Sequence, residues 1–218
     1  MGTSVIGSID EVEKLRGIAL KLLTLDRLLA NCPGLRGKIV LKQIGLNLDS
    51  RPHDFQLCLD EINRLVKQLN DKWGQDTCMF QVVTSIPLER RLAFYAKADV
   101  LFHTSVRWGL SADGPEFVAA NRDRALEADS FIPGPGIKPP KGPGVIVTSE
   151  FVSFSRVLSG ALKINPWSIV DTANTLEEAL KMSFEERTAR HFRDATFADK
   201  TTLETWSRNV LSDLATST

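Results

Sequence analysis

Short apolar runs alternate along the chain with longer stretches in which apolar residues recur every three or four positions. The short runs predict buried strands, and the longer stretches predict helices with one apolar face. The predicted strands are 4–8, 38–46, 79–84, 100–104, 145–148 and 161–164. The predicted helices are 11–30, 54–73, 88–96, 114–124, 151–158, 170–180, 184–195 and 202–214. This alternation predicts a doubly wound α/β fold with a mostly parallel sheet and a helical C-terminal end.

Particular residues mark where several of the predicted helices begin or end. Pro33-Gly34 stops the first long helix, and Asp54 is a plausible N-cap for the second. Pro87 suits the first position of the helix that follows Ser85-Ile86. Ser183 precedes Glu186 by three residues, which is the order of a capping box.

Residues 131–144 contain five prolines and four glycines, a composition that sustains neither a helix nor a strand ladder. We therefore expect an exposed loop, inserted over residues 125–144 in a single domain that covers residues 1–218. A proline-motif ligand for a partner is the alternative, and a tolerated insertion is the favoured interpretation.

Composition narrows the class of protein. The 218 residues have a formal net charge of zero and 25% charged residues, so nothing points to nucleic acid or an anionic membrane. No apolar run reaches the ~18 residues of a membrane span. The first predicted strand begins only three residues into the sequence, and we therefore expect the chain to be a segment of a longer protein. Three widely spaced cysteines favour a reducing, cytoplasmic setting over disulfides or a metal site.

Two turns at the expected carboxyl edge of the sheet are candidate sites, because helix N-termini there bind anions and nucleotides. The first carries Arg16, whose cation suits a diphosphate, although a solvated helix end is the commoner role. The second runs over residues 98–116, with Gly109 at its hinge. Its Glu116 could accept both hydroxyls of a ribose or simply face the helix dipole.

The three histidines form no catalytic constellation. His103 lies in an apolar strand and is expected in the core, whereas His191 is expected on a solvated helix face and His53 has no evident role. The sequence contains no Gly-rich dinucleotide fingerprint, phosphate-cradling lysine loop, serine elbow or cluster of metal ligands. We therefore expect no cofactor and no metal, and assign no catalytic residue.

Several segments together resemble the C-terminal, donor-binding half of trehalose-6-phosphate synthases. They are 35–44, 95–100, 104–107, 149–151 and 158–167. The last two are the most specific, and the likeness runs from residue 6 to residue 214. The resemblance implies one Rossmann-like half of a GT-B glycosyltransferase, which transfers glucose from UDP-glucose to glucose 6-phosphate without metal chemistry. In that family the N-terminal half mainly holds the acceptor.

The resemblance also implies a role for each matching residue. Arg16 stands at the family's diphosphate-binding lysine and keeps the cation. Glu116 stands at the ribose-binding glutamate. The uracil-side turn is retained as Ser85, Ile86 and Pro87.

Other positions depart from the family's pattern. Glu11 replaces the second diphosphate-binding cation, and Trp108 replaces the sugar-binding aspartate. Gly109 is kept, but the next two residues are Leu110 and Ser111 instead of methionine and asparagine. Asp113 places a carboxylate where backbone amides should face phosphate.

These departures predict a nucleotide-sugar pocket that persists as a scaffold with altered electrostatics. Losing a charge-assisted phosphate contact costs ~1.5–3 kcal/mol, and a like charge adds ~1–4 kcal/mol of repulsion. We expect a catalytically inactive, regulatory or scaffolding region of a trehalose-6-phosphate synthase/phosphatase complex, whose partners are other subunits or domains and whose affinity for UDP-glucose is weak or absent. The alternative is the donor-binding half of an active synthase. The chain alone is expected to have no transferase activity.

Overall fold

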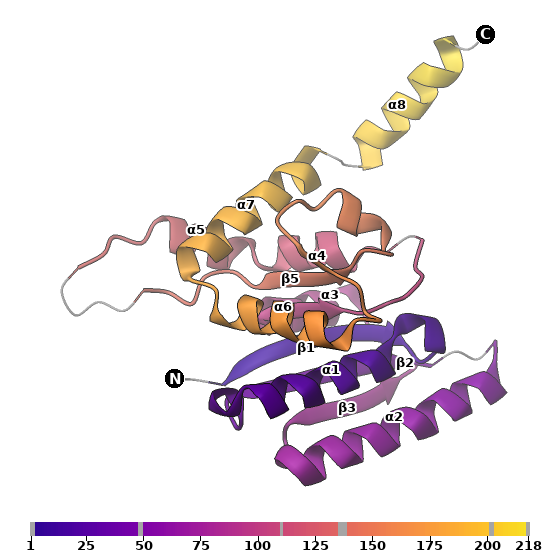
Figure 1. The fold of residues 1–218 in the computed structure, drawn as a ribbon. Helices are drawn as coiled ribbons and strands as arrows, with labels where there is room; N and C mark the ends of the chain where they lie inside the picture. The colour runs from indigo at the N-terminus through magenta and orange to yellow at the C-terminus, as the bar shows by residue number, and fades with distance from the viewer. Residues whose placement is uncertain (1–2, 48–49, 110, 135–138, 201–202, 217–218) are drawn as a thin grey trace.

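Parallel strands joined by crossover helices make up most of the molecule (Figure 1). The computed structural model describes residues 3–47, 50–109, 111–134, 139–200 and 203–216. The strands are β1 (Ser4–Glu11), β2 (Ile39–Leu46), β3 (Cys78–Val83), β4 (Val100–His103), β5 (Val145–Ser149) and β6 (Leu162–Ile164). The helices are α1 (Ile18–Asn31), α2 (Pro52–Trp73), α3 (Leu88–Lys97), α4 (Asp113–Ala120), α5 (Arg122–Asp129), α6 (Ile169–Lys181), α7 (Phe184–Lys200) and α8 (Leu203–Thr216). Short 3-10 turns are η1 (Lys14–Arg16), η2 (Pro33–Leu35) and η3 (Ser153–Arg156).

Within the described residues the strands form one parallel sheet in the order β3-β2-β1-β4-β5-β6. The doubly wound α/β fold predicted from the sequence is therefore confirmed, with α7 and α8 as its helical C-terminal end. Strand order reverses between β1 and β4, where Ile6 lies opposite Val100. The carboxyl ends of these two strands consequently flank the crevice where α/β proteins of this topology bind ligands.

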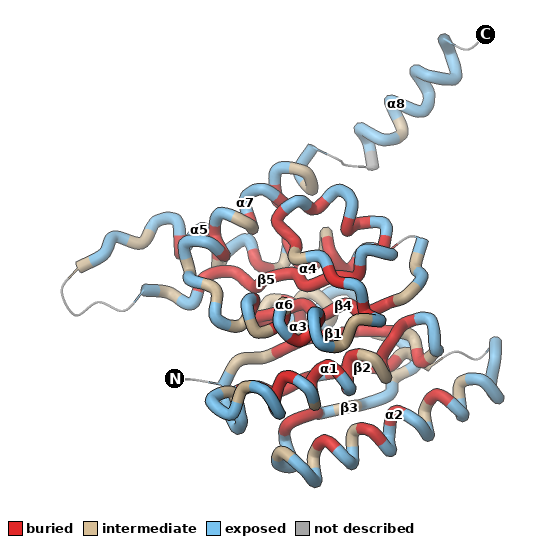
Figure 2. The backbone as a smooth tube through the Cα atoms, in the orientation of Figure 1, coloured by how far each residue is buried: buried red, intermediate tan, exposed pale blue. Residues whose placement is uncertain are grey.

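One buried layer lies on each face of the sheet (Figure 2). The first packs α1, α2 and α6 against the strands, through residues such as Leu22, Ile62 and Leu176. The second packs α3 and α4 against the opposite face, through Tyr95 and Phe117. The helices that follow β1 and β4 thus cover different faces, which leaves the turn after each strand open toward the same crevice.

The first helix begins later than predicted. Glu11 is the last residue of β1, because pairing with β2 continues to Glu11 opposite Leu46. The chain then makes the turn η1 and enters α1 only at Ile18. Gly17 joins them with a φ of 67°, and a Cβ there would lie 2.1 Å from the carbonyl oxygen of Thr104. Glycine is therefore required where these two turns meet.

The predicted helix 114–124 is two helices that meet at Asn121. The Asn121 amide donates to the carbonyl of Tyr95 at 3.2 Å, and its Oδ1 accepts the Gly144 N–H at 2.8 Å. These side-chain bonds hold the break between α4 and α5. Because α5 continues to Asp129, residues 125–129 of the predicted 125–144 insertion are helical.

Three further boundaries differ from the predictions. Asp54 is the third residue of α2 instead of its cap, and Pro87 precedes α3 instead of beginning it. The predicted helix 151–158 is only the 3-10 turn η3. The Ser183 cap is confirmed, since its Oγ accepts the Glu186 N–H at 3.3 Å.

The Pro/Gly loop is tied to the body near both of its ends. The Phe131 ring packs edge-on against Phe184, with 5.7 Å between ring centroids. Lys141 donates to Asp99 Oδ2 at 2.6 Å. Residues 142–144 are buried, so the expectation of full exposure is wrong there. Residues 135–138 lie outside the described residues.

His191 is buried in α7, which corrects its predicted place on a solvated face. Burial, with help from Arg122, lowers the pKa of His191 to about 4. Asp194 lies one turn further along, and its Oδ1 accepts the Gly160 N–H at 2.6 Å. Burial raises the pKa of Asp194 to about 6.

These two shifts oppose each other in the pH dependence of stability. Asp194 contributes to the free energy of unfolding below its unfolded pKa of about 4, and this contribution is lost as the pH rises through 6. The His191 contribution is present above its unfolded pKa of about 6.5 and is lost as the pH falls through 4. Between pH 4 and 6.5 the two slopes therefore largely cancel in the wild-type chain.

Single substitutions are expected to expose each slope. Relative to wild type, Asp194→Asn should lose about 1–2 kcal/mol of stability as the pH falls from 7 to 4.5, a value discounted for partial solvent screening. His191→Gln should lose stability in the opposite direction, as the pH rises from 4.5 to 7. Urea denaturation at both pH values measures this, and parallel profiles for the two variants would contradict it.

Candidate functional site

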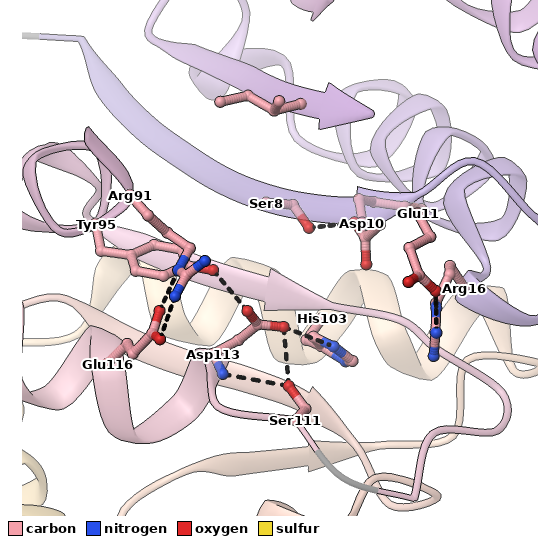
Figure 3. A network of polar contacts seen from close by, with 12 residues as sticks. Ser8, Asp10, Glu11, Arg16, Arg91, Tyr95, His103, Ser111, Asp113 and Glu116 are labelled. Atoms are coloured by element: carbon pink, nitrogen blue, oxygen red, sulfur yellow. Dashed lines mark hydrogen bonds and ion pairs between the residues drawn. The ribbon is translucent and has the colours of Figure 1, made fainter. Parts of the chain in front are cut away.

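The turns that follow β1 and β4 contact each other at the carboxyl edge of the sheet. Val106 N–H donates to the carbonyl of Leu15 at 2.9 Å. The Thr104 hydroxyl donates to the carbonyl of Gly17 at 2.9 Å. This backbone contact brings the two candidate regions of the sequence to one place (Figure 3).

Arg16 does not present a free cation to this crevice. Its Nε donates to Glu11 Oε2 at 3.0 Å, and its Nη2 contacts the same oxygen. Glu13 Oε1 lies 3.2 Å from the same Nε. The Arg16 side chain is only 11% exposed. Two carboxylates of this chain thus surround the guanidinium that was predicted to meet a diphosphate.

Trp108 covers the other side of the same pair. The Arg16 guanidinium carbon lies 3.8 Å from the centroid of the Trp108 ring, within cation–π range. The Trp108 ring also stacks on His103, with 5.1 Å between centroids and 28° between planes. His103 contacts Phe154 edge-on at 5.4 Å. The tryptophan therefore connects the turn after β1 to the second core.

His103 is buried at the end of β4, as predicted for a core histidine. Its ring nitrogens have no hydrogen-bond partner among the described residues. Its Nε2 lies 3.5 Å from Asp113 Oδ2, which exceeds hydrogen-bond length. His103 thus lies between the Trp108 stack and the start of α4.

Asp113 is buried in the first turn of α4 and has its own partners. The Tyr95 hydroxyl donates to Oδ1 at 2.9 Å, and the Ser111 hydroxyl donates to Oδ2 at 2.9 Å. The Asp113 N–H lies 3.2 Å from Ser111 Oγ and donates to it. The amide and the carboxylate at this helix start are consequently satisfied inside the protein. An anion approaching α4 would meet a carboxylate.

Glu116 is held by Arg91, a residue that the sequence interpretation did not identify. Arg91 Nε donates to Oε2 at 2.5 Å, and Nη2 donates to Oε1 at 2.6 Å. The hydrogen bond to Glu116 raises the pKa of Arg91. Both oxygens that could accept a ribose diol are thereby engaged (Figure 3).

The remaining predicted positions lie around this group. Ser85 and Pro87 are exposed, and Ile86 packs against the second core just before α3. Gly109 has open space around it. Leu110 lies outside the described residues, so its predicted role stays a prediction.

A fully buried ion pair supports the crevice from below. Lys21 Nζ donates to Asp10 Oδ2 at 2.6 Å and to Gln43 Oε1 at 2.9 Å, and it also contacts Ser8 Oγ. Gln43 Nε2 donates to Asp10 Oδ2 at 3.0 Å. Although burial opposes ionisation, the Lys21 ammonium holds the pKa of Asp10 below its usual value. The network fixes the end of β1 to β2 and α1.

Within the described ranges, no group of three His, Cys, Asp or Glu side chains is arranged to hold a metal ion. No described helix combines the length and the apolar character needed to cross a bilayer. Cys58 and Cys78 are buried thiols, and Cys32 is half-buried. Burial raises the pKa of Cys78 to about 12.

Fold and crevice together define one Rossmann-like half of a GT-B glycosyltransferase architecture. Glycosyltransferase family 20 matches residues 1–216, and the chain belongs to this family. The resemblance inferred from the sequence is therefore confirmed.

Named relatives and solved structures agree with this assignment. A probable alpha,alpha-trehalose-phosphate synthase of Arabidopsis thaliana is 30% identical over 215 residues, which are 98% of this chain and 24% of the relative. The 56 kDa synthase subunit of Kluyveromyces lactis is 26% identical, with 98% and 40% covered. A synthase structure from Burkholderia xenovorans superposes with a TM-score of 0.85 at 26% identity, covering 98% of this chain and 44% of that one. The chain thus spans less than half the length of these proteins.

Proposed function

We propose that this chain is a synthase-like region of a trehalose-biosynthesis protein that does not bind a nucleotide sugar and acts by regulation or scaffolding. The observation that carries this proposal is the occupied state of Arg16, held by Glu11 and Glu13 and covered by Trp108. The neutralised guanidinium offers a diphosphate little attraction, and the carboxylates around it repel the ligand.

The proposed partners are other subunits or domains of a trehalose-6-phosphate synthase/phosphatase complex. A named subunit among the relatives supports this, since the protein of Kluyveromyces lactis is described as a 56 kDa subunit of a synthase. We further propose that the chain works in the cytoplasm, because three cysteines without a disulfide suit a reducing compartment.

Calorimetry with UDP and with UDP-glucose tests the proposal. We expect no saturable heat from the folded chain at about 1 mM ligand, because the binding free energy should be weaker than about −4 kcal/mol. Circular dichroism and a cooperative urea transition would establish that the sample is folded. Micromolar binding of either ligand would overturn the proposal.

The second candidate function is the donor-binding half of a working UDP-glucose-dependent synthase. The retention of Arg16, Glu116 and the Ser85–Pro87 turn favours it. A 25% identical structure from E. coli, which superposes with a TM-score of 0.85, is described as bound with UDP-2-fluoro glucose. Under this alternative the ion pairs of Arg16 and Glu116 would have to exchange for ligand contacts.

A further inference from the structure

Helix α3 holds both acidic residues in the first turn of α4. Arg91 donates two parallel hydrogen bonds to Glu116. Tyr95, one helical turn later, donates a hydrogen bond to Asp113. Arg91 lies just after the turn that precedes α3, since its backbone N–H donates to the carbonyl of Pro87 at 3.0 Å. Figure 3 shows both contacts side by side, on the opposite side of Asp113 from Arg16.

Arg91 and Glu116 form a planar ion pair joined by two hydrogen bonds, which is a strong type of contact. Fork-like pairing of a guanidinium with a carboxylate directs both oxygens to one partner. The Glu116 side chain is only 17% exposed and that of Arg91 31%, so water competes weakly for the carboxylate. A ribose diol would need the same two oxygens, and it would replace two hydrogen bonds in which both partners are charged by two in which only the acceptor is, leaving the Arg91 guanidinium without its partner. That exchange is unfavourable.

We propose that Arg91 determines the specificity of this crevice by withholding Glu116 from a diol-bearing ligand. This rests on the proposed function, in which the crevice is a former nucleotide-sugar site. The exclusion acts on the nucleoside end and is separate from the altered phosphate end, because Arg91 makes no contact with Glu11, Arg16 or Trp108 among the described interactions. Restoring phosphate contacts alone would therefore leave the nucleoside end closed.

The experiment uses uridine, which carries the diol and no phosphate, with 2′-deoxyuridine as the matched ligand. Binding is followed by saturation-transfer NMR to wild type, Arg91→Met and Arg90→Met. Arg90 is the exposed neighbouring arginine, without an ion pair in the described part of the chain, and it controls for the loss of charge. We expect uridine to bind Arg91→Met about tenfold more tightly than wild type or Arg90→Met, with 2′-deoxyuridine gaining little.

Two further variants keep the result interpretable. Arg91→Lys retains a cation and should remain closed, whereas Arg91→Met combined with Glu116→Gln should lose the gained uridine binding. Each variant is first shown to unfold cooperatively in urea. The proposal is overturned if folded Arg91→Met binds uridine no better than wild type, or if the added Glu116→Gln leaves binding unchanged. Failure of the proposed function would appear elsewhere, as binding of UDP-glucose to the wild-type chain.

Discussion

Replacing Lys21 with methionine is expected to destabilise the fold by about 3–5 kcal/mol, because the change leaves the Asp10 carboxylate buried without its counter-ion. Both side chains are completely buried. Methionine fills a similar volume but donates nothing to Asp10, Ser8 or Gln43, all of which contact the Lys21 ammonium. Urea denaturation at pH 7 measures the loss.

The double variant Lys21→Met/Asp10→Asn separates charge from packing. Removing both charges should recover part of the lost stability, because the buried uncompensated charge disappears. Lys67→Met is the control at an exposed i,i+4 pair with Asp71, where little change is expected. A loss below about 1 kcal/mol for Lys21→Met would show that water reaches Asp10 and that the pair is not the support of β1.

The second large effect is expected in ligand binding. Glu11→Arg combined with Trp108→Asp should raise affinity for UDP about 10- to 100-fold over wild type, measured by calorimetry. The change removes the partner that neutralises Arg16, adds a second cation, and clears the ring that covers the guanidinium. The nucleoside end stays closed by Arg91, so the gain should be larger for pyrophosphate than for uridine.

Glu178→Arg makes the same charge reversal at an exposed position of α6 and should leave UDP binding unchanged. If that control gained as much affinity, the effect would be a general one of net charge. No gain in the folded double variant would mean that lost charge complementarity does not explain the state of this crevice.

The strands were predictable from the sequence because buried parallel strands are short apolar runs bounded by polar residues. All six predicted strands occur, within a few residues of their expected ends. Helix starts were less predictable. The apolar periodicity that begins at Val12 suits a helix, but pairing of β1 with β2 carries the strand through Glu11. Likewise, the break at Asn121 depends on the carbonyl of Tyr95, 26 residues away.

The site was only half predictable for the same reason. The opposite charges of Glu13 and Arg16 lie three residues apart, so their ion pair could have been inferred from that spacing. The partner of Glu116 could not, because Arg91 lies 25 residues earlier on another helix. His191 among three arginines looks solvated in sequence, yet α7 packs against α4 and α5, and His191 is buried.

The Arg16–Trp108–His103 stack has a consequence for any subunit that rests against this edge of the sheet. A binding site that closes around its ligand changes shape with the supply of that ligand. Here the protein's own side chains fill the crevice, so the surface offered to a neighbouring subunit does not depend on whether a ligand is available. Under the proposed function, such a surface is suited to permanent assembly.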